Sequence, residues 1–274
     1  MRLFLLLPLV LSCDPGNSAA ISAAAQPPST IRDFPLPSGF IRMALPQGSF
    51  GEWLRGVRLK KDNTVYLYNG RPKSNQHAQV AVLDVSVGTK DLQQCADAMM
   101  RLRAEYLYAT GAEDKIIFHA TDGTLLDYAS FKKGYRFQPV GRNLYRQLIA
   151  KPTATRKTFD AYLALVFSYC GTASLEKEMR SLPLGKVMPG DVLIHGGSPG
   201  HAVIVMDVIL DKNKRKNILI AQSYMPAQDI HVLRNPMATG DNPWYDLPSG
   251  QDLYTPEWQF SVRECKRFAE GSDD

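Results

Sequence analysis

Apolar and polar positions alternate through residues 77–87, HAQVAVLDVSV, and this period of two predicts a β-strand. Residues 64–68 form a β-rich run that ends at Asn69-Gly70, a strong turn signal. Residues 115–121 predict a third strand. Between these runs, apolar residues recur at spacings of three and four over residues 92–108, which predicts a helix with Asp91 as its N-cap. The apolar stripe consists of Leu92, Cys95, Met99, Leu102 and Tyr106.

The second half of the chain predicts two helices, at residues 159–169 and 174–180, followed by a β-meander. The expected strands are residues 191–195, 201–210 and 218–224, with a further strand at 230–233. We therefore predict an α+β fold. Residues 34–150 would form a smaller α+β half that packs against a second half, residues 151–268.

The N-terminus predicts export. Arg2 precedes a nine-residue apolar run that is too short to span a bilayer, which needs about 20 residues, and fits a signal peptide of residues 1–12. The run ends at Cys13 in a sequence that resembles a lipobox, so we expect Cys13 to be lipidated. The alternative is an ordinary signal peptide cut after the alanine-rich residues 19–25. Residues 13–33 would be a flexible tether and 269–274 a disordered tail. The expected location is the cell envelope, periplasmic or at the outer surface, with the membrane reached through the lipid anchor.

Composition adds mainly exclusions. The chain is 45% hydrophobic and 22% charged, as globular proteins are, and its net charge of +5 comes from scattered basic residues. That distribution gives no support for a nucleic-acid partner. Besides Cys13 only Cys95, Cys170 and Cys265 occur, and no CxxC or Cys/His spacing indicates zinc. We expect no cofactor and at most one disulfide.

One part of the chain resembles a known enzyme family. Pro189-Gly190-Asp191-Val192, followed by GHAVIV at residues 200–205, is similar to the NlpC-type peptidoglycan endopeptidases. The resemblance implies a papain-like fold of one helix and an antiparallel meander. It also implies a catalytic cysteine at the helix N-terminus, a histidine at the start of a strand, and a polar residue on the next strand that orients the imidazole. His201 falls at the histidine position, and Gln222 or Ser223 at the orienting position.

The nucleophile is the weak point of this resemblance. If Gly171 marks the end of the catalytic helix, the nucleophile position falls at residues 158–160, where there is no cysteine. Thr158 is either a hydroxyl nucleophile or the helix N-cap. Asp160 is either an acid/base partner or a charge that stabilises the helix N-terminus. Cys170 lies at the C-terminal end of the helix, where the dipole disfavours a thiolate, so we expect it in the core.

Further polar residues cluster after the third strand of the meander. Tyr224, Gln228 and His231 are candidate substrate contacts, although His201 can equally be a hydrogen-bonded structural residue. Arg103, at the edge of the apolar stripe, is either a structural arginine or a group that binds a substrate carboxylate. A metal site from His195, His201, His231 and Asp207 is conceivable, but no HxH or HExxH spacing supports one, and we predict none.

Longer motifs give a second resemblance. QQCADA with MRLRAEYL near residue 100, GSPGHAV at 197–203 and AQSYMPAQ at 221–228 are similar to a bacterial family of exported proteins known as a domain of unknown function. This implies one integrated unit and names no activity. It also implies that alanine often replaces Cys170.

Three hypotheses remain from the sequence. The first is a hydrolase acting on cell-wall peptide with His201 as general base. The second is a non-catalytic protein that binds an envelope ligand. The third, a structural assembly factor, rests only on the aromatic C-terminal segment.

Overall fold

The computed structural model describes residues 27–240, 242–247, 250 and 252–269. The predictions on the signal peptide, on Cys13 and on residues 270–274 lie outside this range. The expected tether is too long at its C-terminal end, because Ile31 is already fully buried in the core. It belongs to a short 3-10 helix, Ile31–Asp33, whose first turn Asp33 caps through the Thr30 backbone N–H at 2.8 Å.

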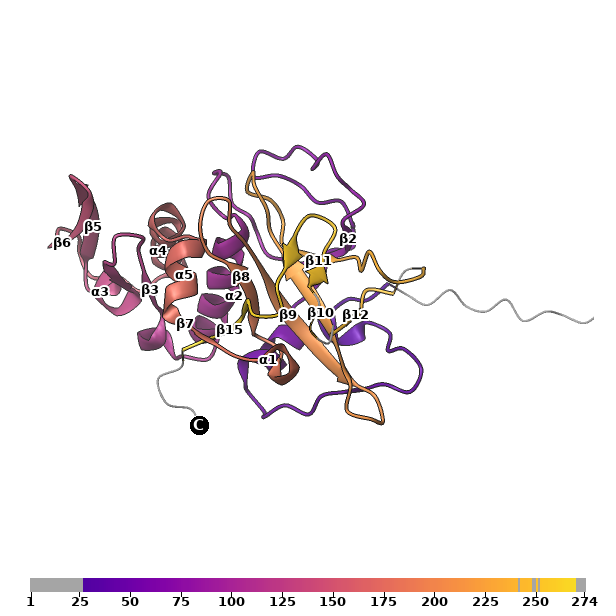
Figure 1. Ribbon diagram of the computed structural model, residues 1–274. Helices are drawn as coiled ribbons and strands as arrows, with labels where there is room; N and C mark the ends of the chain where they lie inside the picture. Colours follow the sequence, from indigo (N-terminus) through magenta and orange to yellow (C-terminus); the bar gives the residue numbers. More distant parts are fainter. Residues whose placement is uncertain (1–26, 241, 248–249, 251, 270–274) are drawn as a thin grey trace, which may run out of the picture.

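The fold is α+β, as predicted, and is built on one large antiparallel sheet (Figure 1). Its central strands run in the order β2-β11-β10-β9-β8-β15-β7, while β1 pairs with β9 and β12 with β10. These strands are β1 (Ile41–Arg42), β2 (Gln79–Val82), β7 (Met179–Ser181), β8 (Val192–His195), β9 (His201–Leu210), β10 (Lys216–Gln222), β11 (His231–Leu233), β12 (Tyr245–Asp246) and β15 (Cys265–Phe268).

Both faces of the sheet are covered. The helices α2, α4 and α5 lie on one side of it in Figure 1, and α2 packs directly on β9. The helices are α1 (Phe50–Arg55), α2 (Cys95–Ala109), α3 (Tyr128–Lys132), α4 (Arg156–Tyr169) and α5 (Thr172–Glu178), with short 3-10 turns at Glu113–Lys115 and Leu184–Lys186. Three separate two-stranded pairs complete the fold: β3 (Ile117–His119) with β4 (Leu125–Asp127), β5 (Tyr135–Val140) with β6 (Asn143–Leu148), and β13 (Leu253–Tyr254) with β14 (Gln259–Phe260).

Strand β9 shows why the meander was predictable. Ala202, Ile204 and Met206 point to the helical side, where they join the larger core cluster. Val203 and Val205 point to the other side, where a smaller cluster includes Tyr245 and Phe260. A strand buried on both faces reads as a nearly continuous apolar run, and the predicted bounds 201–210 agree with those of β9.

Segments from both sides of residue 150 build the same sheet. β1 and β2 precede that residue, yet they pair with β9 and β11, which follow it. Asp207 of β9 is fully buried and binds Arg42 Nε at 2.8 Å and Arg55 Nε at 2.7 Å. Two arginines from the first 60 residues therefore neutralise a carboxylate in the middle of the central strand.

Several predicted boundaries were wrong. Residues 64–68 form only isolated bridges, one from Leu67 to Gln228, instead of a strand. The strand predicted at 77–87 is limited to β2. Helix α2 begins three residues later than expected, because Gln94 is its N-cap and donates its backbone N–H to Asp97 Oδ2 at 2.9 Å. Asp91, the expected cap, instead accepts a hydrogen bond from the Ala227 backbone N–H.

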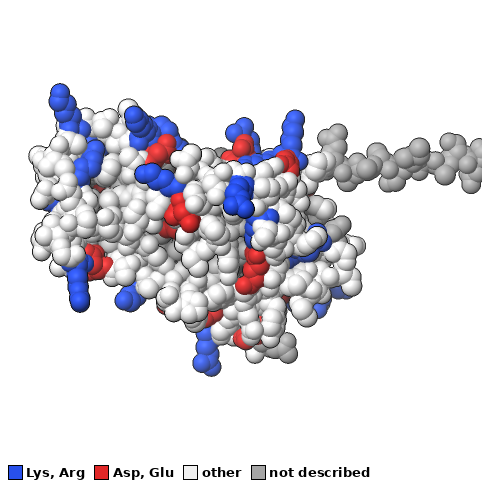
Figure 2. Space-filling view, turned by 90° about the horizontal axis from the view of Figure 1, so that it is seen from above, with Lys and Arg blue, Asp and Glu red and all other residues white. Residues whose placement is uncertain are grey.

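The start of α4 also differs. Its N-cap is Thr155, whose hydroxyl accepts the Thr158 backbone N–H, so Thr158 lies inside the first turn. Within the described residues no helix has the length and apolarity to cross a membrane. In the view from above in Figure 2, the basic side chains are spread over the visible surface and several have acidic neighbours, as expected from their scatter in the sequence.

Candidate functional site

The structure brings His201 and Gln222 into contact. His201 is the first residue of β9 and Gln222 the last residue of β10, so neighbouring antiparallel strands place both at one end of the sheet. The imidazole Nε2 lies 2.8 Å from Gln222 Oε1. His201 is 1% exposed and Gln222 is fully buried. The pair forms the inner end of a polar network.

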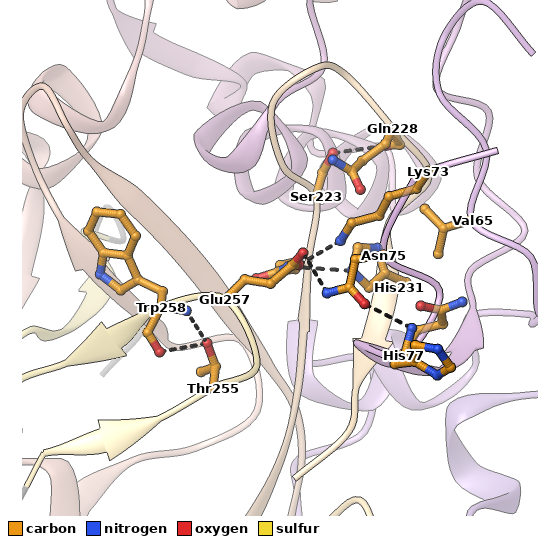
Figure 3. Close-up of polar contacts among 12 residues, drawn as sticks. Val65, Lys73, Asn75, His77, Ser223, Gln228, His231, Thr255, Glu257 and Trp258 are labelled. Carbon is orange, nitrogen blue, oxygen red and sulfur yellow. Dashed lines mark hydrogen bonds and ion pairs between the residues drawn. The ribbon is translucent and has the colours of Figure 1, made fainter. Parts of the chain in front are cut away.

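Glu257 is the centre of that network (Figure 3). Its carboxylate binds Lys73 Nζ at 2.6 Å, Asn75 Nδ2 at 3.2 Å and Gln222 Nε2 at 2.7 Å. Lys73 and Asn75 come from the long segment before β2, and Glu257 from the connection between β13 and β14. Three distant parts of the chain thus meet above the ends of β10 and β11.

The network defines which imidazole nitrogen of His201 carries the proton. An ionised carboxylate only accepts hydrogen bonds, so the Gln222 side-chain NH2 faces Glu257 and its oxygen faces His201. Nε2 of His201 must then be the donor, which leaves Nδ1 with its lone pair. The tautomer is assigned from this geometry. It is the form in which a histidine can accept a proton through Nδ1.

Burial keeps the two histidines of the network neutral. Desolvation lowers the pKa of His201 to about 4 and that of the fully buried His231 to about 4, where the Lys73 cation also contributes. His231 donates from Nδ1 to the carbonyl oxygen of Asp229 at 2.9 Å, and its Nε2 lies 3.4 Å from Gln222 Nε2. His231 thus fixes the Gln222 amide from a second direction.

The ion pair beside them is stabilised in its charged form. Burial alone would raise the pKa of Glu257, but the Lys73 ammonium outweighs it, and the pKa lies below the usual value. Burial lowers the pKa of Lys73, and the Glu257 carboxylate opposes that effect. The Glu257 carboxylate is therefore a fixed negative charge beside the side-chain NH2 of Gln222.

Aromatic rings enclose the His201 imidazole. The ring centroids of Tyr224, Trp258 and Phe260 lie 4.8, 5.3 and 5.8 Å from it. Phe260 is fully buried, whereas Tyr224 and Trp258 are partly exposed and Met225, next in the chain, is 55% exposed. The accessible edge of the site is thus an aromatic and apolar rim.

Cys95 is the residue that the sequence analysis failed to place at this site. It is the first residue of α2, and its Sγ lies 4.0 Å from the carbonyl oxygen of Gly200. The Ala202 backbone N–H also interacts with the thiol and favours its ionised form. The sulfur therefore lies beside the residues on either side of His201. Tyr224 lies near both His201 and Cys95. The pKa of its phenol is raised mainly by burial, then by the Glu257 charge, and then by the negative charge that Cys95 carries as a thiolate.

The thiol and the imidazole approach the start of β9 from different faces. Ala202 points to the α2 side of the sheet, and His201 points to the side of Trp258 and Phe260. Cys95 is 7% exposed, and burial raises its pKa to about 11. In the structure described here, both groups are neutral at pH 7.

Two of the remaining candidates hold the loop after β10. Ser223 donates to the carbonyl oxygens of Gln93 at 3.1 Å and Gln228 at 2.8 Å, which ties this loop to the segment before Cys95. Gln228 is buried, and its side chain donates to the Pro226 carbonyl oxygen at 3.1 Å. Ser223 directly follows Gln222 in the chain, but the side chains of both Ser223 and Gln228 bind backbone groups.

Asp160 and Arg103 lie elsewhere. Asp160 is exposed on α4, where its carboxylate binds Arg156 at 3.0 Å, while Phe159 before it is fully buried among aromatic rings. The guanidinium of Arg103 stacks on Phe50, Tyr106 and Phe268, with ring centroids 5.2, 5.4 and 5.7 Å away. It lies eight residues along α2 from Cys95, more than two helical turns, on the side facing α1.

The four residues considered for a metal site have other partners. Asp207 is bound by two arginines, and His195 Nδ1 lies 2.6 Å from Glu264 Oε1. His201 and His231 share Gln222. Over the described part of the chain, no three histidine, cysteine or acidic side chains come together as metal ligands would.

A usable signal for Cys95 was present in the sequence. The residue lies in the apolar stripe of the predicted helix, but with Asp91 as N-cap it appeared to lie within the helix. Gln94 is a weaker N-cap by residue type, and only its bond with Asp97 reveals that Cys95 opens the helix. The NlpC-type resemblance also placed the nucleophile in the helix that directly precedes the meander.

Comparison with protein families identifies the family of this chain. The model of DUF4846, described as "Domain of unknown function (4846)", matches residues 31–267. No curated protein and no solved structure matches the chain. The match covers almost all of the described residues, including Cys95, His201 and Gln222, and starts at the first buried residue, Ile31. The chain therefore belongs to the DUF4846 family.

Proposed function

We propose that this protein is a cysteine-dependent hydrolase of amide bonds in cell-wall peptide, with Cys95 as nucleophile, His201 as base and Gln222 as the residue that orients the imidazole. The observation that carries the proposal is the position of Cys95. Its thiol lies at the N-terminus of a 15-residue helix and 4.0 Å from the carbonyl oxygen of the residue before His201.

The order of the elements supports a papain-like interpretation. Along the chain, a helix that starts with cysteine is followed by a strand that starts with histidine and by a neighbouring strand that ends with glutamine. The NlpC-type resemblance implies this order. In the proposal, α2 takes the role of the catalytic helix, which the sequence analysis assigned to residues 159–169, and more than 80 residues separate it from the meander.

The proposed reaction uses the neutral resting pair. His201 Nδ1 accepts the Cys95 thiol proton as sulfur attacks the substrate carbonyl carbon, and the imidazolium then protonates the leaving amine. Water, deprotonated by the same nitrogen, hydrolyses the thioester and releases the acid. The positive end of the α2 dipole stabilises the thiolate as it forms. Proton transfer requires hydrogen-bond contact, and the thiol and the imidazole lie on different faces of β9, so the proposal requires that substrate binding turn the start of β9 and bring the imidazole to the side of Cys95.

The proposed substrate follows from the expected location. A signal peptide with a lipobox-like end would anchor the chain in the cell envelope, where cell-wall peptide is the abundant amide polymer. The aromatic rim of Tyr224 and Trp258 offers apolar contact area for a bound segment.

A second candidate function is a non-catalytic protein that binds an envelope ligand. Two observations favour it: burial raises the pKa of Cys95 to about 11, and the imidazole projects from the face of β9 opposite to α2. In this case the network around Glu257 would be structural, and the aromatic rim would be the binding surface.

Digestion of purified cell-wall sacculi by the full chain tests the proposal, with released fragments identified by mass spectrometry. We expect fragments from the wild type and from Cys170→Ala, which removes a thiol away from the site, and none from Cys95→Ala or His201→Ala. Fragments from Cys95→Ala would exclude the thiol mechanism. Sacculi that retain the wild-type protein but release no fragments would contradict the hydrolase and support the binding protein.

A further inference from the structure

A cavity of about 350 Å³ is lined by the segment 86–93, Arg101 of α2 and helix α4. A neighbouring hollow of about 570 Å³ shares Ser86, Arg101 and Arg156 with it. Even without the neighbouring hollow, the smaller cavity is large enough to hold a small ligand. Its chemistry comes from Lys90, Gln93, Arg101, Arg156, Asp160 and Phe167.

Gln93 supplies a buried donor without a partner. The residue is 1% exposed, and its side-chain oxygen accepts a hydrogen bond from Arg101 Nη1 at 3.4 Å. Its Nε2 has no hydrogen-bond partner among the described residues. Nε2 is itself enclosed, so it can donate to a ligand acceptor only when the Gln93 side chain turns toward the cavity that it lines, and this contact would satisfy a donor that is unsatisfied in the protein alone.

The charges around the cavity favour an anion. Three cationic side chains line it, those of Lys90, Arg101 and Arg156, against the single carboxylate of Asp160. Glu105, below them, holds both guanidinium groups in place, with Oε1 2.7 Å from Arg101 Nε and 2.6 Å from Arg156 Nη2. Even with Glu105 counted, the positive charges outnumber the negative ones, and the two arginines are fixed before any ligand arrives.

The opposite wall is apolar. Leu163, Ala164 and Phe167 line the cavity from one face of α4, and Val87 and Leu92 line it from the segment before α2. A ligand that fits must therefore combine an acceptor group with negative charge at one end and an apolar substituent at the other.

We propose that this cavity binds a small carboxylate with an apolar side group, such as an N-acylated amino acid or the C-terminal residue of a peptide. The carboxylate would accept the Gln93 amide proton and lie beside Arg101, and the side group would contact Leu163 and Phe167. Cys95 does not line this cavity, and the proposal does not depend on the proposed hydrolase activity.

Calorimetric titration of the full chain with N-acetylleucine tests the proposal, with N-acetylleucinamide as the matched neutral ligand. We expect saturable binding of the acid, and about tenfold weaker binding of the amide, because one charge-assisted hydrogen bond is lost. Gln93→Leu should weaken binding of the acid by about the same factor. Lys212→Gln, an exposed change in the β9–β10 turn, should leave binding unchanged.

A second variant guards against a folding defect in Gln93→Leu. Ala164→Phe fills the cavity from the α4 wall and should abolish binding, with folding checked by circular dichroism. Equal binding of the acid and the amide, unchanged binding in a folded Gln93→Leu or Ala164→Phe variant, or no saturable binding of N-acetylleucine would each overturn the proposal.

Discussion

At the scale of single residues, the orientation of one side-chain amide determines the chemistry of His201. Gln222 is symmetric in shape but not in hydrogen bonding, and the Glu257 carboxylate at 2.7 Å, supported by His231 Nε2 at 3.4 Å, distinguishes its two ends. Glu257 is itself held by Lys73 and Asn75. A carboxylate that is separated from the imidazole by one residue, Gln222, thus selects the tautomer with a free Nδ1.

Glu257→Gln tests this dependence. Glutamine can donate as well as accept, so only the longer contact with His231 Nε2 would still direct the Gln222 amide, and we expect His201 to populate both tautomers. Nitrogen-15 NMR of the imidazole reports the change, with the wild type showing protonated Nε2 and unprotonated Nδ1. Glu264→Gln, which alters the exposed pair with His195, is the control. Unchanged His201 shifts in Glu257→Gln would show that the ion pair does not orient the amide.

The low pKa of His231 predicts a pH dependence of stability. In the folded protein burial lowers that pKa from 6.5 to about 4. Between these values the unfolded chain binds a proton that the folded protein does not, so this residue reduces the free energy of unfolding as the pH falls from 6.5 to 4. Below pH 4 the loss is complete.

Urea unfolding of the wild type and His231→Gln at pH 7 and pH 4.5 measures this effect. At pH 7 the variant should be the less stable, because it loses buried hydrogen bonds. The difference in free energy of unfolding between wild type and variant should narrow by about 1.4 kcal/mol per pH unit below 6.5. Only the wild type loses stability in this range, because unfolded His231 takes up a proton and glutamine does not. A difference that stays constant between the two pH values would mean that His231 titrates normally in the folded protein.

At the scale of elements, Thr172 of α5 holds the loop before β9, and this loop contains Gly200, whose carbonyl oxygen lies next to Cys95. A Cβ at Gly200 would lie 2.4 Å from Thr172 Oγ1 and 2.6 Å from the Gly197 carbonyl oxygen. Thr172 also donates to that carbonyl oxygen at 3.2 Å, so the loop before β9 is fixed on the first turn of α5.

Gly200→Ala should therefore destabilise the fold by about 1–3 kcal/mol, the usual range for overpacking. Gly185→Ala is the matched control, since a Cβ there meets nothing within 4 Å. The two free energies of unfolding from urea titrations decide the comparison. Equal free energies of unfolding for the two variants would show that the loop before β9 can shift to accommodate the added Cβ without loss of stability.

The elements also show which parts of the fold were predictable. The strands β8 to β11 were predicted close to their observed bounds, because their Val, Ile and Leu residues favour β-strands and turn residues separate them. The short strand β2 and the bridges at residues 64–68 were not, because their pairing depends on β11 and Gln228, far along the chain. For the same reason the His201–Gln222 contact followed from a local pattern, whereas Cys95 reaches Gly200 across 105 positions.

At the scale of the whole molecule, the two ranges divided at residue 150 depend on each other. Helix α2 packs on β9, β2 completes the pairing of β11, and Asp207 would be an unpaired buried charge without Arg42 and Arg55. A buried ion that loses its partners destabilises a fold by about 3–5 kcal/mol.

We therefore expect residues 27–150 and 151–274 to be unfolded when produced separately. Circular dichroism and amide exchange of each fragment measure this, and an equimolar mixture should regain protection in β9 and β10. Asp207→Ala in the intact chain should reduce stability by an amount comparable to the loss of the ion pairs, with Asp114→Ala, whose side chain is 87% exposed, as control. A cooperative thermal transition in either fragment alone would contradict the expectation.

The position of α2 in the chain has a consequence for how the molecule is made. The helix emerges more than 100 residues before β10, the second strand of the face it covers, so its apolar side has no docking surface until most of the chain is available. Contacts of such sequence separation slow folding, since a large loop must close before they form. A chain threaded through an export channel from its N-terminus would therefore remain extended during passage, and the thiol, imidazole and amide would first meet after the last strand has crossed.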